Sequence, residues 1–303
     1  MADNDDNAVA PAAGDLGKRR VGVVGAGVMG RDIAETLATH GHPVVLIDLS
    51  PDILKAAGAT IRASLRGKAL TGQGRPGFIA RTLDRIAFTT EFDALGEVDF
   101  VIENVSENIE AKRSAFACLD NSCRPDTVVA ANTSTHPITE LARLIRRPDR
   151  IVGIHFMNPA TTKPLVEVIA GAQSSPEAMR DALDLLAGIG KTGVLVKDTP
   201  GFVSNRVLML TINEAIQVVE AGTASAEDVD RIFVGCFGHA MGPLATADLI
   251  GLDTIQLSLE SLRDHFGDSK FEPAALLKGM TRSGRLGRKT AQGFFRYDFA
   301  GNA

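Results

Sequence analysis

The chain has 303 residues, of which 45% are hydrophobic and 23% are charged, and its 37 acidic residues outnumber its 32 basic ones to give a net charge of −5. This balance is typical of a folded protein with room for two domains, and it excludes an intrinsically disordered chain. The acidic excess without a basic block disfavours a nucleic-acid partner. No apolar stretch approaches the roughly 20 residues that a membrane helix needs, so we expect no membrane partner.

Residues 1–18 contain Asp3, Asp5, Asp6 and an Ala/Pro run, with neither a basic start nor an apolar core. We therefore interpret them as a disordered tail and not as a secretory signal. The three cysteines, Cys118, Cys123 and Cys236, show neither metal-ligand spacing nor an even disulfide framework. This predicts reduced thiols, a cytoplasmic location and no metal site.

From Arg20 onward, short β-branched runs alternate with longer helical stretches, which predicts a Rossmann-type, doubly wound, mostly parallel sheet. The segment 52–84 predicts a helical hairpin inserted into it, with its tip at Gly72, Gly74, Pro76 and Gly77. The predicted strands are Val21–Val24, Val44–Ile47, Phe100–Ile102, Thr127–Ala130, Ile151–Ile154, Leu165–Ile169 and Val194–Val196.

The strand pattern ends at the segment KDTPGF, where Pro200 and Gly201 interrupt the chain. We place the domain boundary there, with a dinucleotide-binding domain at 19–199 and an all-α domain at 200–303. The spacing of apolar residues in the second domain predicts helices. They cover Val203–Glu220, Ala226–Cys236, Leu252–Phe266 and Pro273–Met280.

A glycine-rich turn joins the first predicted strand to a helix and matches the dinucleotide fingerprint G-x-G-x-x-G. Asp48 ends the second strand, where a carboxylate can accept hydrogen bonds from the adenine ribose and would repel a 2′-phosphate. We therefore predict NAD as the cofactor, in preference to NADP. The predicted cofactor-binding turn is Gly25, Ala26, Gly27, Val28, Met29 and Gly30.

Four polar segments follow the ends of apolar strands: ENVSENIEAK, ANTST, HFMNP with PLVEV, and DTPGFVSNR. In this order they resemble the 3-hydroxyacyl-CoA dehydrogenases. The resemblance runs from Arg20 to Tyr297 and includes MGPLATADLIGLDT and GRLGRKTAQGFF. It implies an NAD-dependent oxidation of a 3-hydroxyacyl thioester, and a homodimer.

The resemblance assigns the catalytic roles. It makes His155 the general base, Glu167 the acid that orients it, Ser134 the partner of the reacting oxygen and Asn205 the partner of the thioester carbonyl. The substrate would then lie in an interdomain cleft. Taken alone, a His–Glu pair is more often structural, Ser134 could end a turn, and Asn205 could cap a helix.

The same resemblance implies further contacts. Ser64 is expected to bind substrate, and Ser134 to contact cofactor as well as substrate. The remaining predicted cofactor contacts are Glu107, Lys112, Asn132, Asn158 and Lys289.

Some positions depart from the family pattern and leave the carrier of the acyl group open. Asn104 and Ser106 replace small or apolar residues, and Thr71 replaces a frequent lysine that meets the CoA nucleotide. The chain resembles most a subgroup that oxidises glyceryl groups on acyl carrier proteins, on the route to methoxymalonyl or hydroxymalonyl units for polyketides. Either this role or fatty acid metabolism with a CoA substrate fits.

Two other hypotheses about the function remain open. One is a β-hydroxyacid or sugar-acid dehydrogenase that accepts a free acid. The other is a catalytically silent protein that binds NAD and serves as a partner. The presence of His155, Glu167, Ser134 and Asn205 together favours an enzyme.

Overall fold

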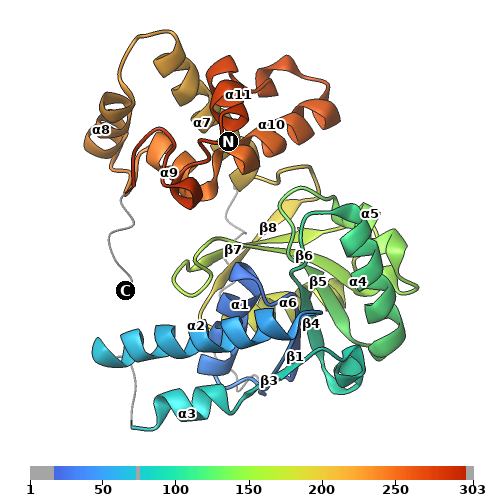
Figure 1. The fold of residues 1–303 in the computed structure, drawn as a ribbon. Coiled ribbons are helices and arrows are strands. Elements are labelled where there is room, and N and C mark those ends of the chain that lie inside the picture. Colours follow the sequence, from blue (N-terminus) through green and yellow to red (C-terminus); the bar gives the residue numbers. More distant parts are fainter. Residues whose placement is uncertain (1–16, 73–75, 298–303) are drawn as a thin grey trace, which may run out of the picture. The chain divides into compact units, whose positions relative to one another are not determined.

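The computed structural model describes residues 17–72 and 76–297 and has two compact units, Met1–Asp198 and Thr199–Ala303 (Figure 1). Residues 1–16 of the predicted tail lie outside the described residues, as does Gly74 of the predicted hairpin tip.

An eight-stranded sheet forms the first unit, with the strand order β3-β2-β1-β4-β5-β6-β7-β8. All neighbours are parallel except β6 and β7, which are antiparallel. The predicted class, a mostly parallel Rossmann-type sheet, is confirmed. The strands are β1 (Val21–Val24), β2 (Val44–Ile47), β3 (Ile86–Thr89), β4 (Phe100–Glu103), β5 (Val128–Ala131), β6 (Ile151–Phe156), β7 (Leu165–Ala170) and β8 (Thr192–Lys197).

Two differences from the predicted strands affect the site. β3 was not predicted, because it is a short edge strand in which only Ile86 is buried. The strand predicted to end at Ile154 continues to Phe156 as β6, since its last residues pair with the antiparallel strand β7. His155, expected just past a strand, therefore lies inside one.

Helices cover both faces of the sheet (Figure 1). On one face, α1 (Val28–Thr39), α2 (Pro51–Leu70) and α6 (Pro176–Gly188) share a buried cluster with alternate strand residues. On the other face lie the 3₁₀ helix η1 (Phe92–Glu97), α4 (Ile109–Ser122) and α5 (Ile138–Leu141). The predicted hairpin consists of α2 and α3 (Phe78–Leu83). Burial on both faces explains why most strands are uninterrupted apolar runs.

The second unit is helical in the part of the chain that the structure describes. Its core is one cluster contributed by all five α-helices, with residues such as Ile212, Leu244, Ile255 and Leu277. The helix α9 was not predicted, because its apolar residues are spread around the helix and do not gather on one face. The helices are α7 (Ser204–Glu220), α8 (Ala226–Phe237), α9 (Pro243–Ile250), α10 (Leu252–Phe266) and α11 (Ala275–Arg282), with 3₁₀ turns η4 (Ser269–Phe271) and η5 (Arg288–Thr290). None of the described helices has the length and apolarity to cross a bilayer.

Candidate active site

His155 and Glu167 face each other across the antiparallel pair β6 and β7. The Nδ1 of His155 lies 2.8 Å from Oε2 of Glu167, and both residues are buried. Because an ionised carboxylate can only accept, Nδ1 carries the hydrogen and donates it to Glu167. In the neutral imidazole, Nε2 then presents a lone pair to its surroundings.

Ser134 lies on the other side of the imidazole. It follows β5 in the loop before α5, and its Oγ is 3.1 Å from Nε2 of His155. The three predicted residues thus form one chain of contacts, Ser134 to His155 to Glu167. A hydroxyl group placed at Nε2 would meet both a proton acceptor and the Ser134 hydroxyl group, which is an arrangement suited to general base catalysis.

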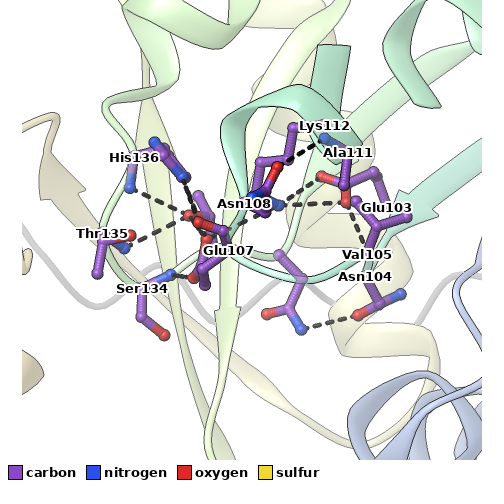
Figure 2. A network of polar contacts seen from close by, with 12 residues as sticks. Glu103, Asn104, Val105, Glu107, Asn108, Ala111, Lys112, Ser134, Thr135 and His136 are labelled. Carbon is purple, nitrogen blue, oxygen red and sulfur yellow. Dashed lines mark hydrogen bonds and ion pairs between the residues drawn. The ribbon is translucent and has the colours of Figure 1, made fainter. Parts of the chain in front are cut away.

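Glu107 holds the backbone of the loop that carries Ser134 (Figure 2). Its carboxylate accepts the Ser134 N–H at 2.5 Å and the Thr133 hydroxyl group at 2.7 Å. The same carboxylate lies 3.8 Å from Nζ of Lys112, while His136 contacts the Glu107 carbonyl oxygen through Nε2 at 3.1 Å. Glu107 therefore joins the start of α4 to the loop after β5.

Lys112 was predicted to contact cofactor, but its side chain is fully buried. Its Nζ lies 3.0 and 3.2 Å from the two carboxylate oxygens of Glu103, which is equally buried (Figure 2). Burial raises the pKa of the Glu103 carboxyl group, while the ammonium of Lys112 and the N–H of Val105 act in the opposite direction. Of the two predicted cofactor contacts, Lys112 is therefore enclosed by protein, whereas the Glu107 side chain is 38% exposed.

Three residues of this network were not predicted. Glu103 could have been predicted as a site residue, because it is the only acid in a buried apolar strand and lies at its end. Thr133 and His136 flank the predicted Ser134, but nothing in their spacing indicates a bond to Glu107.

The glycine-rich turn has the geometry that a bound pyrophosphate requires. Gly25 has φ of +94°, and a side chain there would meet the backbone of Asn104 at 2.7 Å. Gly27 directly precedes α1, and no other atom lies within 4 Å of where its side chain would be. No side chain caps the first N–H groups of this helix. A side chain at Gly30 would meet the Gly25 carbonyl oxygen at 1.8 Å. The first N–H groups of α1 are thus available to a phosphate, and the residues present fit NAD.

Asp48 lies next to this turn, as predicted from the sequence. Its Oδ2 accepts the N–H of Ala26 at 2.9 Å and its Oδ1 accepts the N–H of Ser50 at 3.0 Å. Each oxygen keeps a further lone pair for a ribose hydroxyl group.

The other predicted site residues lie elsewhere. Asn158 is exposed, two residues beyond β6. Ser64 on α2 donates its hydroxyl hydrogen to the buried carboxylate of Glu35 at 2.8 Å. Asn205 on α7 and Lys289 on η5 belong to the second unit.

Within that second unit, the Nζ of Lys289 is held by both carboxylate oxygens of Asp253 at 2.5 Å. Among residues 17–72 and 76–297, no cluster of three or more His, Cys, Asp or Glu side chains is arranged to hold a metal ion.

Comparisons with known proteins agree on one family. Residues 20–199 match the 3-hydroxyacyl-CoA dehydrogenase NAD-binding domain, and residues 201–297 match the C-terminal domain of the same enzymes. The chain is 41% identical over 280 residues to a probable 3-hydroxybutyryl-CoA dehydrogenase of Bacillus subtilis, covering 92% of this chain and 98% of that one. A probable 3-hydroxybutyryl-CoA dehydrogenase of Deinococcus radiodurans is 42% identical over 279 residues, covering 92% and 100%. The crystal structure of the (S)-3-hydroxybutyryl-CoA dehydrogenase of Ralstonia eutropha superposes with a TM-score of 0.89 at 39% identity, covering 93% and 100%.

Proposed function

The chain belongs to the 3-hydroxyacyl-CoA dehydrogenase family, whose members are NAD-dependent oxidoreductases, and we propose that it oxidises the C3 hydroxyl group of a short 3-hydroxyacyl-CoA such as 3-hydroxybutyryl-CoA. The product is the 3-oxoacyl thioester. The observation that supports this most is the contact chain from Ser134 through His155 to Glu167.

In the proposed reaction, the substrate hydroxyl group lies at Nε2 of His155 and accepts a hydrogen bond from Ser134 Oγ. Nε2 takes the hydroxyl proton while the C3–H bond breaks and the C3–O bond becomes a carbonyl. NAD, when bound, supplies the acceptor for the hydride. Glu167 holds the Nδ1 hydrogen and provides the counter-charge for the imidazolium that forms. Asn205 as partner of the thioester carbonyl stays a prediction from the family resemblance.

An acyl carrier protein is the second candidate carrier of the acyl group, because the surface of α2 exposes positive charge. Ser64 and Lys68, on the side of α2 that faces α1, are both engaged by the Glu35 carboxylate, at 2.8 and 2.7 Å. Arg62 and Arg66 are exposed on the same helix and offer positive charge to an acidic partner. Because the Glu35 carboxylate engages Ser64 and Lys68, the exposed charge that α2 offers to a carrier protein includes Arg62 and Arg66.

The test is NADH formation with four substrates: 3-hydroxybutyryl-CoA, its pantetheine thioester, a 3-hydroxyacyl or glyceryl carrier protein, and free 3-hydroxybutyrate. We expect kcat/KM to be highest with the CoA thioester. A higher value with the free acid would overturn the proposal in favour of a β-hydroxyacid dehydrogenase. A preference for the carrier protein that is lost in Arg62→Glu and Arg66→Glu, and weakened by salt, would assign the second carrier.

We also propose that the protein forms a homodimer through its second unit. This unit exposes large apolar side chains on two helices: Val207 on α7 is 60% exposed, and Ile232 and Phe237 on α8 are 50% and 66% exposed. Large apolar side chains exposed on the surface of a folded unit are typical of subunit contacts. Light scattering should give twice the chain mass for the wild type, and Phe237→Asp combined with Ile232→Asp should give monomers. A monomeric wild type would contradict the proposal.

A further inference from the structure

The backbone ladder between β5 and β6 does not extend to Ser134 and His155. Strands β5 and β6 pair from Val129 with Ile151 to Ala131 with Gly153, and the ladder stops there. Ser134 and His155 both lie beyond this last pair. Some other contact must therefore set the separation of the two chain segments at the point where Ser134 Oγ and His155 Nε2 lie 3.1 Å apart.

The side chain of Asn132 provides that contact. Its Oδ1 accepts the backbone N–H of Phe156, the residue next to His155, at 3.1 Å. Its own backbone N–H donates to the carbonyl oxygen of Glu103 at 2.8 Å. One residue thus links the ends of β4, β5 and β6, two positions before Ser134.

Asn104 fixes the orientation of this amide. The Nδ2 of Asn132 donates to Oδ1 of Asn104 at 2.7 Å, and the Nδ2 of Asn104 donates in turn to the carbonyl oxygen of Ile102 at 3.0 Å. Because a carbonyl oxygen can only accept, the Asn104 amide must present its oxygen to Asn132. Asn132 then has its NH₂ group toward Asn104 and its oxygen toward Phe156.

We propose that Asn104 is a positioning residue: through Asn132 it sets the separation of the segments that carry Ser134 and His155, and so the rate of hydride transfer. This inference rests on the proposed function. It assigns to Asn104 an effect on the reaction rate that requires no contact with the reacting atoms. A displacement of about 1 Å between reacting groups is enough to cost up to 100-fold in rate.

The variant Asn104→Leu keeps the size of the side chain and removes both of its hydrogen bonds. We expect kcat to fall about 2- to 10-fold, because Asn132 loses a neutral hydrogen bond that holds its amide in place, and we expect the KM for NAD to stay unchanged. The deuterium isotope effect for substrate labelled at C3 should rise, because hydride transfer becomes slower relative to the other steps.

The isotope effect separates positioning from mere loss of stability. A smaller folded fraction lowers the rate with both isotopic substrates equally, so their ratio does not change. Asn121→Leu, a substitution of an exposed asparagine on α4, is the matched control and should leave kcat and the isotope effect unchanged.

A double-mutant cycle tests the route through Asn132. Asn132→Ala should lower kcat more than Asn104→Leu does, and the double variant should be no slower than Asn132→Ala alone, because Asn104 acts only through Asn132. Additive losses would overturn the inference, as would a raised KM for NAD with an unchanged isotope effect. If the wild type reduces NAD with none of the four substrates, the proposed function fails and the inference with it. If the wild type is active and Asn104→Leu matches it, only the inference fails.

Discussion

The carboxylate of Glu167 offers the sharpest test of the electrostatics of the site. Glu167→Gln preserves the shape of the side chain and its hydrogen bond to Nδ1, and removes only the charge. For two charge centres about 4 Å apart at an effective dielectric constant of about 20, the attraction between carboxylate and imidazolium is about 4 kcal/mol. The neutral hydrogen bond that remains recovers about 1 kcal/mol. The transition state should thus lose about 3 kcal/mol, which lowers kcat roughly 100-fold.

The assay is NADH formation at saturating NAD and 3-hydroxybutyryl-CoA, repeated with substrate deuterated at C3 to show that hydride transfer limits the rate. Glu177→Gln is the matched control, because Glu177 is an exposed carboxylate on α6 paired with Arg180 at 3.1 Å. It should leave kcat unchanged. If Glu167→Gln turned over within about twofold of the wild type while hydride transfer is rate-limiting, the counter-charge role of Glu167 would be refuted.

Three further predictions concern parts of the first unit outside the His155 dyad. Asp48→Ala should reduce the preference for NAD over NADP in kcat/KM, since the carboxylate that repels a 2′-phosphate is gone; a wild type that prefers NADP would contradict this. Lys112→Met leaves the buried Glu103 unpaired, which should cost about 3–5 kcal/mol and lower Tm by about 6–20 °C, and an unchanged Tm would argue against the pair. Burial raises the pKa of the Cys123 thiol from 9.0 to about 11, so at pH 8.5 iodoacetamide should alkylate the exposed Cys236 well before Cys123. Alkylation of Cys123 as fast as Cys236 would contradict this. Because the folded state holds the thiol proton more tightly than the unfolded state, the contribution of Cys123 to the free energy of unfolding should also fall as pH rises from about 9 to about 11.

Local pattern was sufficient for the buried part of the fold. Val21–Val24 and Val44–Ile47 were predicted with the bounds that the structure has, because strands buried on both faces are short apolar runs bounded by polar residues and glycine. Ile86–Thr89 was not predicted, because two of its four residues are exposed at the edge of the sheet. Leu252–Phe266 was predicted with its observed bounds, whereas Pro243–Ile250 was missed because its apolar residues do not gather on one face and so give no helical period.

The candidate site was predicted in part, and the reason lies in which contacts are local. The glycine-rich turn and Asp48 lie on consecutive elements, a strand, a turn, a helix and the next strand, so their spacing in the sequence was enough to predict them. The pairing of His155 with Glu167 depends on the register of two antiparallel strands, which spacing does not specify. Glu103 could not be recognised as the partner of Lys112, because that pair depends on how α4 packs against the sheet.

The central claim is that His155 removes the hydroxyl proton as hydride leaves C3, and the most direct measurement is single-turnover NADH formation by wild type and His155→Gln with substrate that carries hydrogen or deuterium at C3. The account predicts a variant that is slower by about 10²–10⁴, shows a C3 isotope effect because hydride transfer limits its rate, and binds NAD with little change in affinity. A His155→Gln variant with a near-wild-type single-turnover rate would contradict it.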